Sequence, residues 1–477
     1  MRHKTLHGML GWSAADQFFR LVCQFLVVIV LARLLTPTDF GLYAMLSIFV
    51  GLANTFANAG LTDALIQRKV TTHQEESSLF FFTIALALVV ALILSVMSHW
   101  IAVFYKQPLL ESIAYVMGFC VFIGSFTSVQ TALFSKAYDF KTTALIGAVV
   151  SLFSGAVAIS AAWAGWGVWS LVTQTLVATI LSTLIFWFKH PWRPKLFFNL
   201  ACIRPYLSFG GYLLISRLIN VVSVNLYTLI IGKFYSAQEV GIFNRASNFQ
   251  NLLINSMSGI VAKVAFPVFA AAAEDHDRLE RGLNKALLGT VFLSVPIAIV
   301  LVFLAEPIVW VLFGDQWIKS IPILQILGLE ALIWPFHLLN VSLLMSMGRG
   351  NLMFIGALVK FSVTLIMLFI AAPYGLTIMA LAFVGSSYLN LFVNIYFTKC
   401  VLDYGLSKQF NAVMPCFLSG IPMIFLLYVT ISFLKVNHIA ILIIGFLLGI
   451  SAYVISGYKL RIFTRDQLAK FLPIIFR

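Results

Sequence analysis

Long apolar segments alternate with short polar ones along the whole chain. The run FFFTIALALVVALILSVM (80–97) is one of them, and it is long enough for a single helix to cross the hydrocarbon core of a bilayer. Strands of membrane barrels are shorter and alternate in polarity, so the pattern predicts helices. The predicted fold class is an all-α polytopic membrane protein. Fourteen spans follow from the pattern, with approximate bounds 9–33, 41–64, 78–102, 110–133, 142–163, 167–188, 207–231, 241–266, 286–305, 320–347, 352–372, 376–398, 411–434 and 438–457.

The composition supports this class and excludes others. Hydrophobic residues make up 61% of the 477 positions and charged residues 10%, whereas an average soluble domain carries about 25% charged residues. The net charge of +14 comes from basic residues in short loops between spans, so we expect no nucleic acid partner. The five cysteines show neither a disulfide nor a metal-ligand spacing, and no P-loop motif for ATP occurs. We expect neither a cofactor nor a metal.

The lysine and arginine residues predict the orientation of the chain. Most of the 31 lie in the N-terminal segment, in every second loop and in the C-terminal tail. Basic residues in short loops mark the cytoplasmic side of a membrane protein. The even number of spans then places both termini in the cytoplasm. The loops on the other side hold Arg33, Lys106, Lys233, Lys319 and Lys435.

The first twelve spans contain a duplication. LARLLTPTDFGLY (31–43) aligns without gaps with IGKFYSAQEVGIF (231–243), and three further segments repeat in the same order at similar offsets. This predicts two homologous six-helix lobes, and an even number of helices per lobe makes the repeats parallel. The predicted domains are an N-terminal lobe over 1–188, a cytoplasmic linker over 189–206, a C-terminal lobe over 207–398, two extra helices over 399–457 and a basic cytoplasmic tail over 458–477.

Polar residues form stripes on the first two helices of each lobe. In SAADQFFRLVCQF (13–25), Asp16 and Arg20 lie one turn apart in an apolar span, where each charge costs at least about 2.5–3.5 kcal/mol on insertion scales. Such residues rarely face lipid, so we expect the stripes to line a water-filled cavity between the lobes. Hydrogen bonding between helices is the alternative role for the asparagines and serines. The candidate substrate-binding residues are Arg20, Arg217, Arg245, Lys360, Asn58, Asn220, Asn248 and Asn251.

Two carboxylates are candidates for ion coupling, Asp16 and Glu330. A desolvated carboxylate beside a cation has two accessible charge states, which a coupled transporter needs. Glu330 shares a helix face with His337, seven positions further along the chain. A structural ion pair is the alternative for each carboxylate, with Arg20 as the partner of Asp16 and Lys360 as the partner of Glu330.

The segments LLTPTDFGLYAML (34–46) and AGLTDALIQRK (59–69), with the plan of twelve plus two helices, resemble a known family. They are similar to the polysaccharide-transporter (Wzx-type flippase) branch of the multidrug/oligosaccharidyl-lipid/polysaccharide (MOP) exporter superfamily. The resemblance implies a flippase that moves an undecaprenyl-diphosphate-linked oligosaccharide from the cytoplasmic to the periplasmic leaflet. The oligosaccharide would be an O-antigen, capsule or exopolysaccharide repeat unit. Alternating access would be driven by a proton or sodium gradient.

The same resemblance implies a location and a set of partners. The location is the bacterial inner membrane, and the partners are the lipid-linked glycan, membrane lipids, and polysaccharide polymerase and chain-length machinery. The buried cations would bind phosphate and acidic sugar, and the asparagines would bind sugar hydroxyls.

Two other functions remain open at this point. A small-molecule multidrug exporter of the same superfamily would need carboxylates for cationic drugs, but buried cations outnumber carboxylates here. A polytopic O-antigen ligase or polymerase would need a large external loop for its chemistry, and the longest external segment expected here is 306–320. The excess of buried cations favours an anionic substrate, and the short external segments favour a transporter over an enzyme.

Overall fold

The computed structural model describes residues 24–68, 70–272, 275–433 and 437–462. The described residues form α-helices and short 3₁₀ helices, with no strand among them, which confirms the all-α class. The contacts divide the chain into two compact units, unit 1 (Met1–Gly241) and unit 2 (Ile242–Arg477). Each unit has its own interior.

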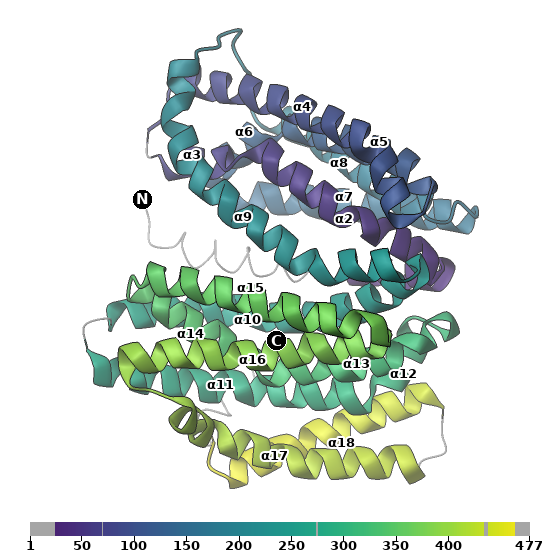
Figure 1. Cartoon of the computed structure of the whole chain (residues 1–477), viewed down its shortest axis with the longest axis vertical. Helices are drawn as coiled ribbons and strands as arrows, with labels where there is room; N and C mark the ends of the chain where they lie inside the picture. The colour runs from purple at the N-terminus through teal and green to yellow at the C-terminus, as the bar shows by residue number, and fades with distance from the viewer. Residues whose placement is uncertain (1–23, 69, 273–274, 434–436, 463–477) are drawn as a thin grey trace. The chain divides into compact units, whose positions relative to one another are not determined.

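Unit 1 is a bundle of long helices (Figure 1). Among its close neighbours, α4 packs against α5, α7 packs against α8, and α9 packs against α2, α3 and α4. The bounds are Gln24–Leu34 for the first described helix, then α2 Pro37–Asn58, α3 Leu61–Gln67, α4 His73–Tyr105, α5 Leu109–Ser125, α6 Ser128–Lys136, α7 Phe140–Trp163, α8 Trp169–Lys189 and α9 Leu200–Phe234.

Unit 2 contains most of α10, which crosses the boundary at Gly241, and all the helices that follow it. Here α15 packs against α16, α11 packs against α17, and α17 packs against α18 (Figure 1). The bounds are α10 Ala237–Ala271, α11 His276–Phe303, α12 Ala305–Leu312, η1 Asp315–Ser320, α13 Ile321–Gly328, η2 Leu329–Leu332, α14 Trp334–Ser346, α15 Gly350–Ala371, η3 Ala372–Tyr374, α16 Leu376–Leu402, α17 Leu406–Phe433 and α18 His438–Lys459.

Within the described part of the chain, fewer membrane-length helices are present than the fourteen spans that the sequence predicts for the whole chain. Among the described residues, ten helices are long and apolar enough to cross a membrane, and up to twelve spans result if each of two bent pairs is one span. The prediction of fourteen spans is therefore not confirmed. The two predicted spans outside this count are 9–33, of which residues 9–23 lie outside the described part, and 241–266, which lies within α10.

Repeat-related positions share local geometry. Thr36 caps α2 and exchanges hydrogen bonds with Asp39, and Ser236 makes the same reciprocal bonds with Glu239 at the start of α10. The fourth predicted span of each lobe is bent at the same stage, by 44° between α5 and α6 and by 41° before α14. These paired features support the duplication. The predicted division into lobes at 189–206 stays a prediction.

The two related helix starts contact each other closely inside unit 1. A Cβ atom added at Gly41 would lie 1.6 Å from the carbonyl oxygen of Ala237, and one added at Gly241 would lie 1.8 Å from that of Pro37. Pro37 and Ala237 are themselves paired by the alignment of the repeats. Only glycine allows backbones to approach this closely.

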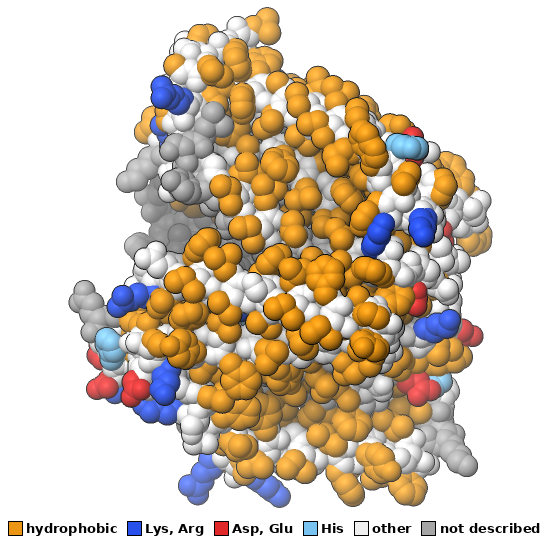
Figure 2. Space-filling view, viewed as in Figure 1, with side chains coloured by type: hydrophobic (Ala, Val, Ile, Leu, Met, Phe, Trp, Pro, Cys, Tyr) orange, Lys and Arg blue, Asp and Glu red, His pale blue; other side chains and the backbone are white. Residues whose placement is uncertain are grey.

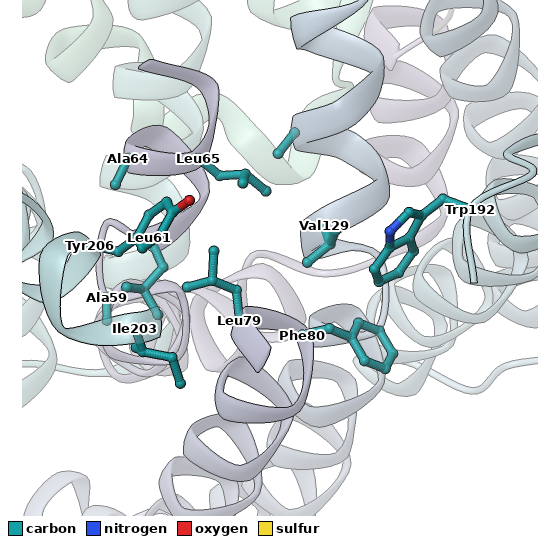
Figure 3. Close-up of a cluster of buried hydrophobic side chains, with 11 residues drawn as sticks. Ala59, Leu61, Ala64, Leu65, Leu79, Phe80, Val129, Trp192, Ile203 and Tyr206 are labelled. Atoms are coloured by element: carbon teal, nitrogen blue, oxygen red, sulfur yellow. The ribbon is translucent and has the colours of Figure 1, made fainter. Parts of the chain in front are cut away.

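The segment between α8 and α9 and the start of α9 are each anchored to unit 1 by an aromatic residue. Trp192 and Tyr206 are buried in a hydrophobic cluster, together with Phe80 of α4 (Figure 3). The Trp192 ring also stacks on His73, at a centroid distance of 5.8 Å. The segment is therefore held against one end of the bundle. The other members of the cluster are Ala59, Leu61, Ala64, Leu65, Leu79, Val129, Ala132 and Ile203.

Apolar side chains cover most of the face shown in Figure 2, and charged side chains gather towards the ends of the helices. On α4 a row of large apolar residues is more than 40% exposed. Such a surface suits contact with lipid, because the backbone of a membrane-crossing helix satisfies its own hydrogen bonds. The exposed residues of α4 include Leu88, Val89, Leu92, Ile93 and Val96.

Candidate functional site

In unit 1, Arg217 forms an ion pair that its local sequence does not reveal. Nη2 of Arg217, on α9, lies 2.6 Å from Oδ2 of Asp63, in the first turn of α3. Left-handed conformations at Ala59 and Gly60 end α2 and start α3, and this turn places Asp63 against α9. The Arg217 side chain is 50% exposed. A half-exposed guanidinium on a membrane-length helix needs water or an anion beside it, because lipid gives it no hydrogen-bond acceptor.

Among the polar residues of α2, Ser47 bonds to α9, whereas Asn54 and Asn58 bond to their own helix. Ser47 donates to Oδ1 of Asn225, at 3.2 Å, while Nδ2 of Asn54 and of Asn58 each donate to a backbone carbonyl one turn earlier. Asn220 lies on the exposed surface of α9. Asn58, Asn220 and Arg217 are thus on neighbouring helices of unit 1, and their role in substrate binding stays a prediction.

In unit 2, Arg245 is enclosed by aromatic rings. Its side chain is 6% exposed, and its guanidinium carbon lies 5.4 Å from the ring centroid of Phe313 and 5.0 Å from that of Trp317. Such contacts stabilise a desolvated cation by about 2 kcal/mol. Asn248 and Asn251, further along α10, are exposed instead, and Nδ2 of Asn251 bonds to Ser247.

Glu330 is buried at a break between helices. It lies in the 3₁₀ segment η2, between α13 and α14, and is 7% exposed. Gln250 of α10 donates to Oε2 at 3.0 Å, and the Ser387 hydroxyl of α16 donates to Oε1 at 3.1 Å. Both donors are neutral, so the carboxylate is hydrogen-bonded without a direct cationic partner in these contacts. The alternative of a direct ion pair with Lys360 is not what the structure contains.

Lys360 reaches the same region through two further side chains. Its Nζ donates to Oδ1 of Asn394 at 3.0 Å, and Nδ2 of Asn394 lies 2.7 Å from Nδ1 of His337. On the other side of the imidazole, Nε2 lies 3.1 Å from the carbonyl oxygen of Ser387. Side chains from η2, α14, α15 and α16 therefore form one continuous chain of polar contacts, from Glu330 to Lys360.

The polar stripe on α16 went unrecognised in the sequence analysis. Ser387, Asn390, Asn394 and Thr398 recur at intervals of three and four in an otherwise apolar helix, which was the available signal.

Two other predicted residues, Asp16 and Arg20, lie outside the described residues. Within the described part of the chain, no group of three or more His, Cys, Asp or Glu side chains is placed to hold a metal ion.

Membrane-length helices with enclosed cations, amides and a buried carboxylate define a polytopic helical membrane transporter. The chain belongs to the polysaccharide biosynthesis protein family, whose model matches residues 30–322. The predicted superfamily is confirmed by this match and by the relatives that follow.

Curated relatives align over most of the chain. The teichuronic acid biosynthesis protein TuaB of Bacillus subtilis is 25% identical over 87% of this chain and 86% of its own length. The lipopolysaccharide biosynthesis protein WzxC of Escherichia coli is 28% identical over 78% of this chain and 75% of its own. The succinoglycan biosynthesis transport protein ExoT of Rhizobium meliloti is 25% identical over 75% and 72%. These names describe transport and biosynthesis of polysaccharides.

Solved structures share the fold. The lipid II flippase MurJ in an inward closed conformation matches with a TM-score of 0.78, over 96% of this chain and 99% of that chain, at 16% identity. An inward-facing multidrug transporter of the MATE family, which belongs to the MOP superfamily, matches with a TM-score of 0.65, over 81% and 98%, also at 16% identity. The fold is therefore that of MOP-superfamily transporters.

Proposed function

We propose that this protein is a flippase for an undecaprenyl-diphosphate-linked oligosaccharide, which it moves from the cytoplasmic to the periplasmic leaflet by ion-coupled alternating access. The proposal places the chain in the bacterial inner membrane with both termini in the cytoplasm. Polysaccharide polymerase and chain-length machinery would use the product. Family membership and the polysaccharide named for each relative support the substrate class.

The observation that carries the proposal is the half-exposed Arg217, paired with Asp63 inside unit 1. A diphosphate carries about two negative charges, and the arginine fork binds phosphate oxygens through two donors at once. In the absence of substrate, Asp63 neutralises the guanidinium. When a phosphate approaches, it competes with the Asp63 carboxylate for the same guanidinium donors. The positive charge of Arg217 is therefore always balanced by an anion, first the carboxylate and then the phosphate, and is not exposed alone to lipid.

The remaining predicted residues have different roles in this proposal. Asn58, Asn220, Asn248 and Asn251 offer amides to sugar hydroxyls, and the exposed positions of the last three make them accessible. Arg20 would provide a second phosphate ligand. Arg245 and Lys360 are more enclosed than Arg217, so they would act on the substrate through the field of their charges or after a change of conformation.

Reconstitution into liposomes tests the proposal directly. Purified protein is incorporated with a fluorescent undecaprenyl-diphosphate oligosaccharide, and a membrane-impermeant lectin or pyrophosphatase measures the fraction of glycan lipid in the outer leaflet over time. We expect rapid exchange between leaflets, and loss of exchange in the variant R217A. Exchange no faster than in protein-free liposomes would refute the flippase function.

A matched control separates phosphate binding from general loss of charge. Arg204 lies on the same helix as Arg217 and is exposed, but it belongs to the segment before the membrane-length window. R204A should exchange glycan lipid as the parent protein does. Transport of a cationic dye, with no transport of the glycan lipid, would instead favour a multidrug exporter.

A further inference from the structure

The turn between α6 and α7 holds a tyrosine in a backbone conformation that glycine usually adopts. The φ angle of Tyr138 is +55°, in the left-handed region, where the Cβ atom of an L-residue lies too close to the following carbonyl oxygen. Tyr138 is the first residue beyond the C-cap of α6, and glycine is the common residue at that position. The side chain is 67% exposed, so packing of the ring does not compensate for the strain.

The second repeat makes the same turn with glycine. After α6, the residue that follows Tyr138 donates its N–H to the carbonyl oxygen five positions before it, at 3.0 Å, and after α14 the residue that follows Gly348 does the same, at 3.1 Å. The φ angle of Gly348 is +67°. Both turns lead directly into the next helix, α7 at Phe140 and α15 at Gly350. The turn therefore requires a left-handed residue but no aromatic ring, and a ring in this strained position needs its own explanation.

Exposed aromatic residues at the other end of α7 avoid the strain. Trp163 and Trp166 are both exposed, and such residues are typical of a membrane surface. The left-handed positions among them are Gly165 and Gly167, with φ angles of +81° and +53°. An aromatic ring that only has to lie at the membrane surface therefore needs no strained backbone. The contrast indicates that the ring of Tyr138 has a different role.

Phe140 extends the exposed aromatic surface next to Tyr138, and we name these two residues the aromatic pair. Their ring centroids lie 6.2 Å apart with an angle of 72° between the planes, and Phe140 is 41% exposed. The carboxylate of Asp139, between them in the sequence, caps α7. Two residues before Tyr138, Nζ of Lys136 donates to the hydroxyl of Thr71 at 2.9 Å. The aromatic pair therefore lies at the end of unit 1 where the predicted cytoplasmic loops meet.

We propose that the aromatic pair is a binding site for sugar rings of the lipid-linked oligosaccharide, an inference that rests on the proposed flippase function. Before transport, the oligosaccharide extends from the cytoplasmic leaflet into the water on that side, where this end of unit 1 is predicted to lie. The C–H groups of a sugar ring form an apolar face, and the negative face of an aromatic ring attracts them. The phenolic hydroxyl of Tyr138 both donates and accepts hydrogen bonds, which suits sugar hydroxyls.

The site would distinguish one oligosaccharide from another. Every substrate of this class carries the same diphosphate, so binding at Arg217 cannot discriminate between glycans. Contacts with the sugar rings can, because stacking requires a ring with an unobstructed C–H face. Tyrosine has only two side-chain torsions, so little conformational entropy is lost when its ring orders against a ligand. The aromatic pair is therefore expected to set the preference for the glycan, and Arg217 to bind the part that all substrates share.

The first experiment compares two ligands of the purified protein in detergent micelles. One is the undecaprenyl-diphosphate oligosaccharide of the liposome assay, and the other is undecaprenyl diphosphate without sugar. Microscale thermophoresis measures each dissociation constant. We expect Y138G to weaken binding of the glycan lipid by about two- to tenfold and to leave the sugar-free lipid unchanged, since a single aromatic contact has that magnitude. Y138F, which keeps the ring, should retain most of the affinity, and R217A should weaken binding of both ligands.

Lys106 provides the matched control for the glycine substitution. It has the same φ angle of +55° and ends α4 in the same kind of turn. K106G and Y138G should both raise the melting temperature, because glycine removes the left-handed strain. Only Y138G should weaken glycan-lipid binding. A lower melting temperature for Y138G would show that the ring supports the fold, and would overturn the proposal.

The remaining outcomes separate the sugar site from the flippase function. If Y138G binds the glycan lipid as the parent protein does while R217A binds it weakly, the sugar site is refuted and the flippase function stands. Weaker binding of both ligands by Y138G would show that the ring contacts the lipid carrier or the membrane surface, and would also overturn the sugar site. A parent protein that binds neither ligand would refute the flippase function and the sugar site together.

Discussion

Arg217 and Asp63 are far apart in the chain, yet their charged atoms lie 2.6 Å from each other in unit 1. If the pair is a displaceable substrate site, R217A should abolish surface polysaccharide while the protein still inserts at normal levels. R217K should recover part of the export, because it keeps the charge but loses the two-donor geometry. Export of polysaccharide and membrane abundance are measured together, with R204A as the control for a basic residue on the same helix.

A purely structural ion pair has a different signature. In that case R217A and D63A should both lower membrane abundance, and the charge reversal D63R/R217D should restore abundance and export together. Normal export from the reversed pair would contradict phosphate binding at Arg217, because a carboxylate in that position repels the substrate.

We predict that Arg20 has a related role, although it lies outside the described residues. Arg20 and Arg217 both belong to the first predicted helix of a lobe, so R20A should also abolish export without loss of the protein, and R20K should restore it partly. The test is the same export assay. Normal export from the double variant D16A/R20A would show that the two residues form only a structural salt bridge.

The orientation in the membrane can be tested with reporter fusions. Within unit 1, Lys136 bonds to Thr71 and the backbone of Lys195 bonds to Ser77, so the loops predicted to be cytoplasmic lie together at one end. Periplasmic-reporter fusions after Lys106, Gly165 and Lys435 should be active, and fusions after Lys195 and Lys470 should be inactive. Activity after Lys195 would reverse the predicted orientation.

The close contact at Gly41 predicts a large effect from a single methyl group. G41A places a Cβ atom 1.6 Å from the carbonyl oxygen of Ala237, so the starts of α2 and α10 must separate. We expect a lower melting temperature for the purified protein. G289A is the control, because a Cβ atom there meets no other atom within 4 Å, and alanine favours a helix over glycine by about 0.5–1 kcal/mol. A melting temperature for G41A equal to that of G289A would contradict the contact.

Much of the fold could be predicted because each helix carries its own signal. The predicted spans 142–163 and 438–457 lie within two residues of the ends of α7 and α18, since apolar length is set by the thickness of the bilayer. The bend before α14 lies beside Pro335, a residue that marks a kink in the sequence, but the bend between α5 and α6 was harder to predict. Phe126 and Thr127 separate α5 from α6 inside an apolar run, and no proline or charge marks the break. The number of spans among the described residues therefore depends on whether each bent pair crosses the membrane as one span.

The candidate site was only partly predictable for a related reason. Glu330 and Lys360 were both identified as buried charges, because an ionisable residue in an apolar span stands out in the sequence. Their connection through Asn394 was not, since asparagine in a membrane helix serves equally well as a packing residue. Asp63 was likewise outside the predicted site, because it lies near a helix end where a carboxylate needs no special explanation.

By itself, the sequence determined the helical membrane class, the internal duplication and the identity of the buried charges. These properties depend on the order of residues along the chain: on the length of apolar runs, on the spacing of polar residues and on segments that repeat. All of them can be found in the linear sequence without knowing which helices contact each other. Only the tertiary structure decided which charges meet: Arg217 with Asp63, and Lys360 with His337 through Asn394. Such pairs form between helices that are distant in the sequence. The packing of the helices and the turns between them decide which residues meet, and the periodicity of a single helix does not contain that information.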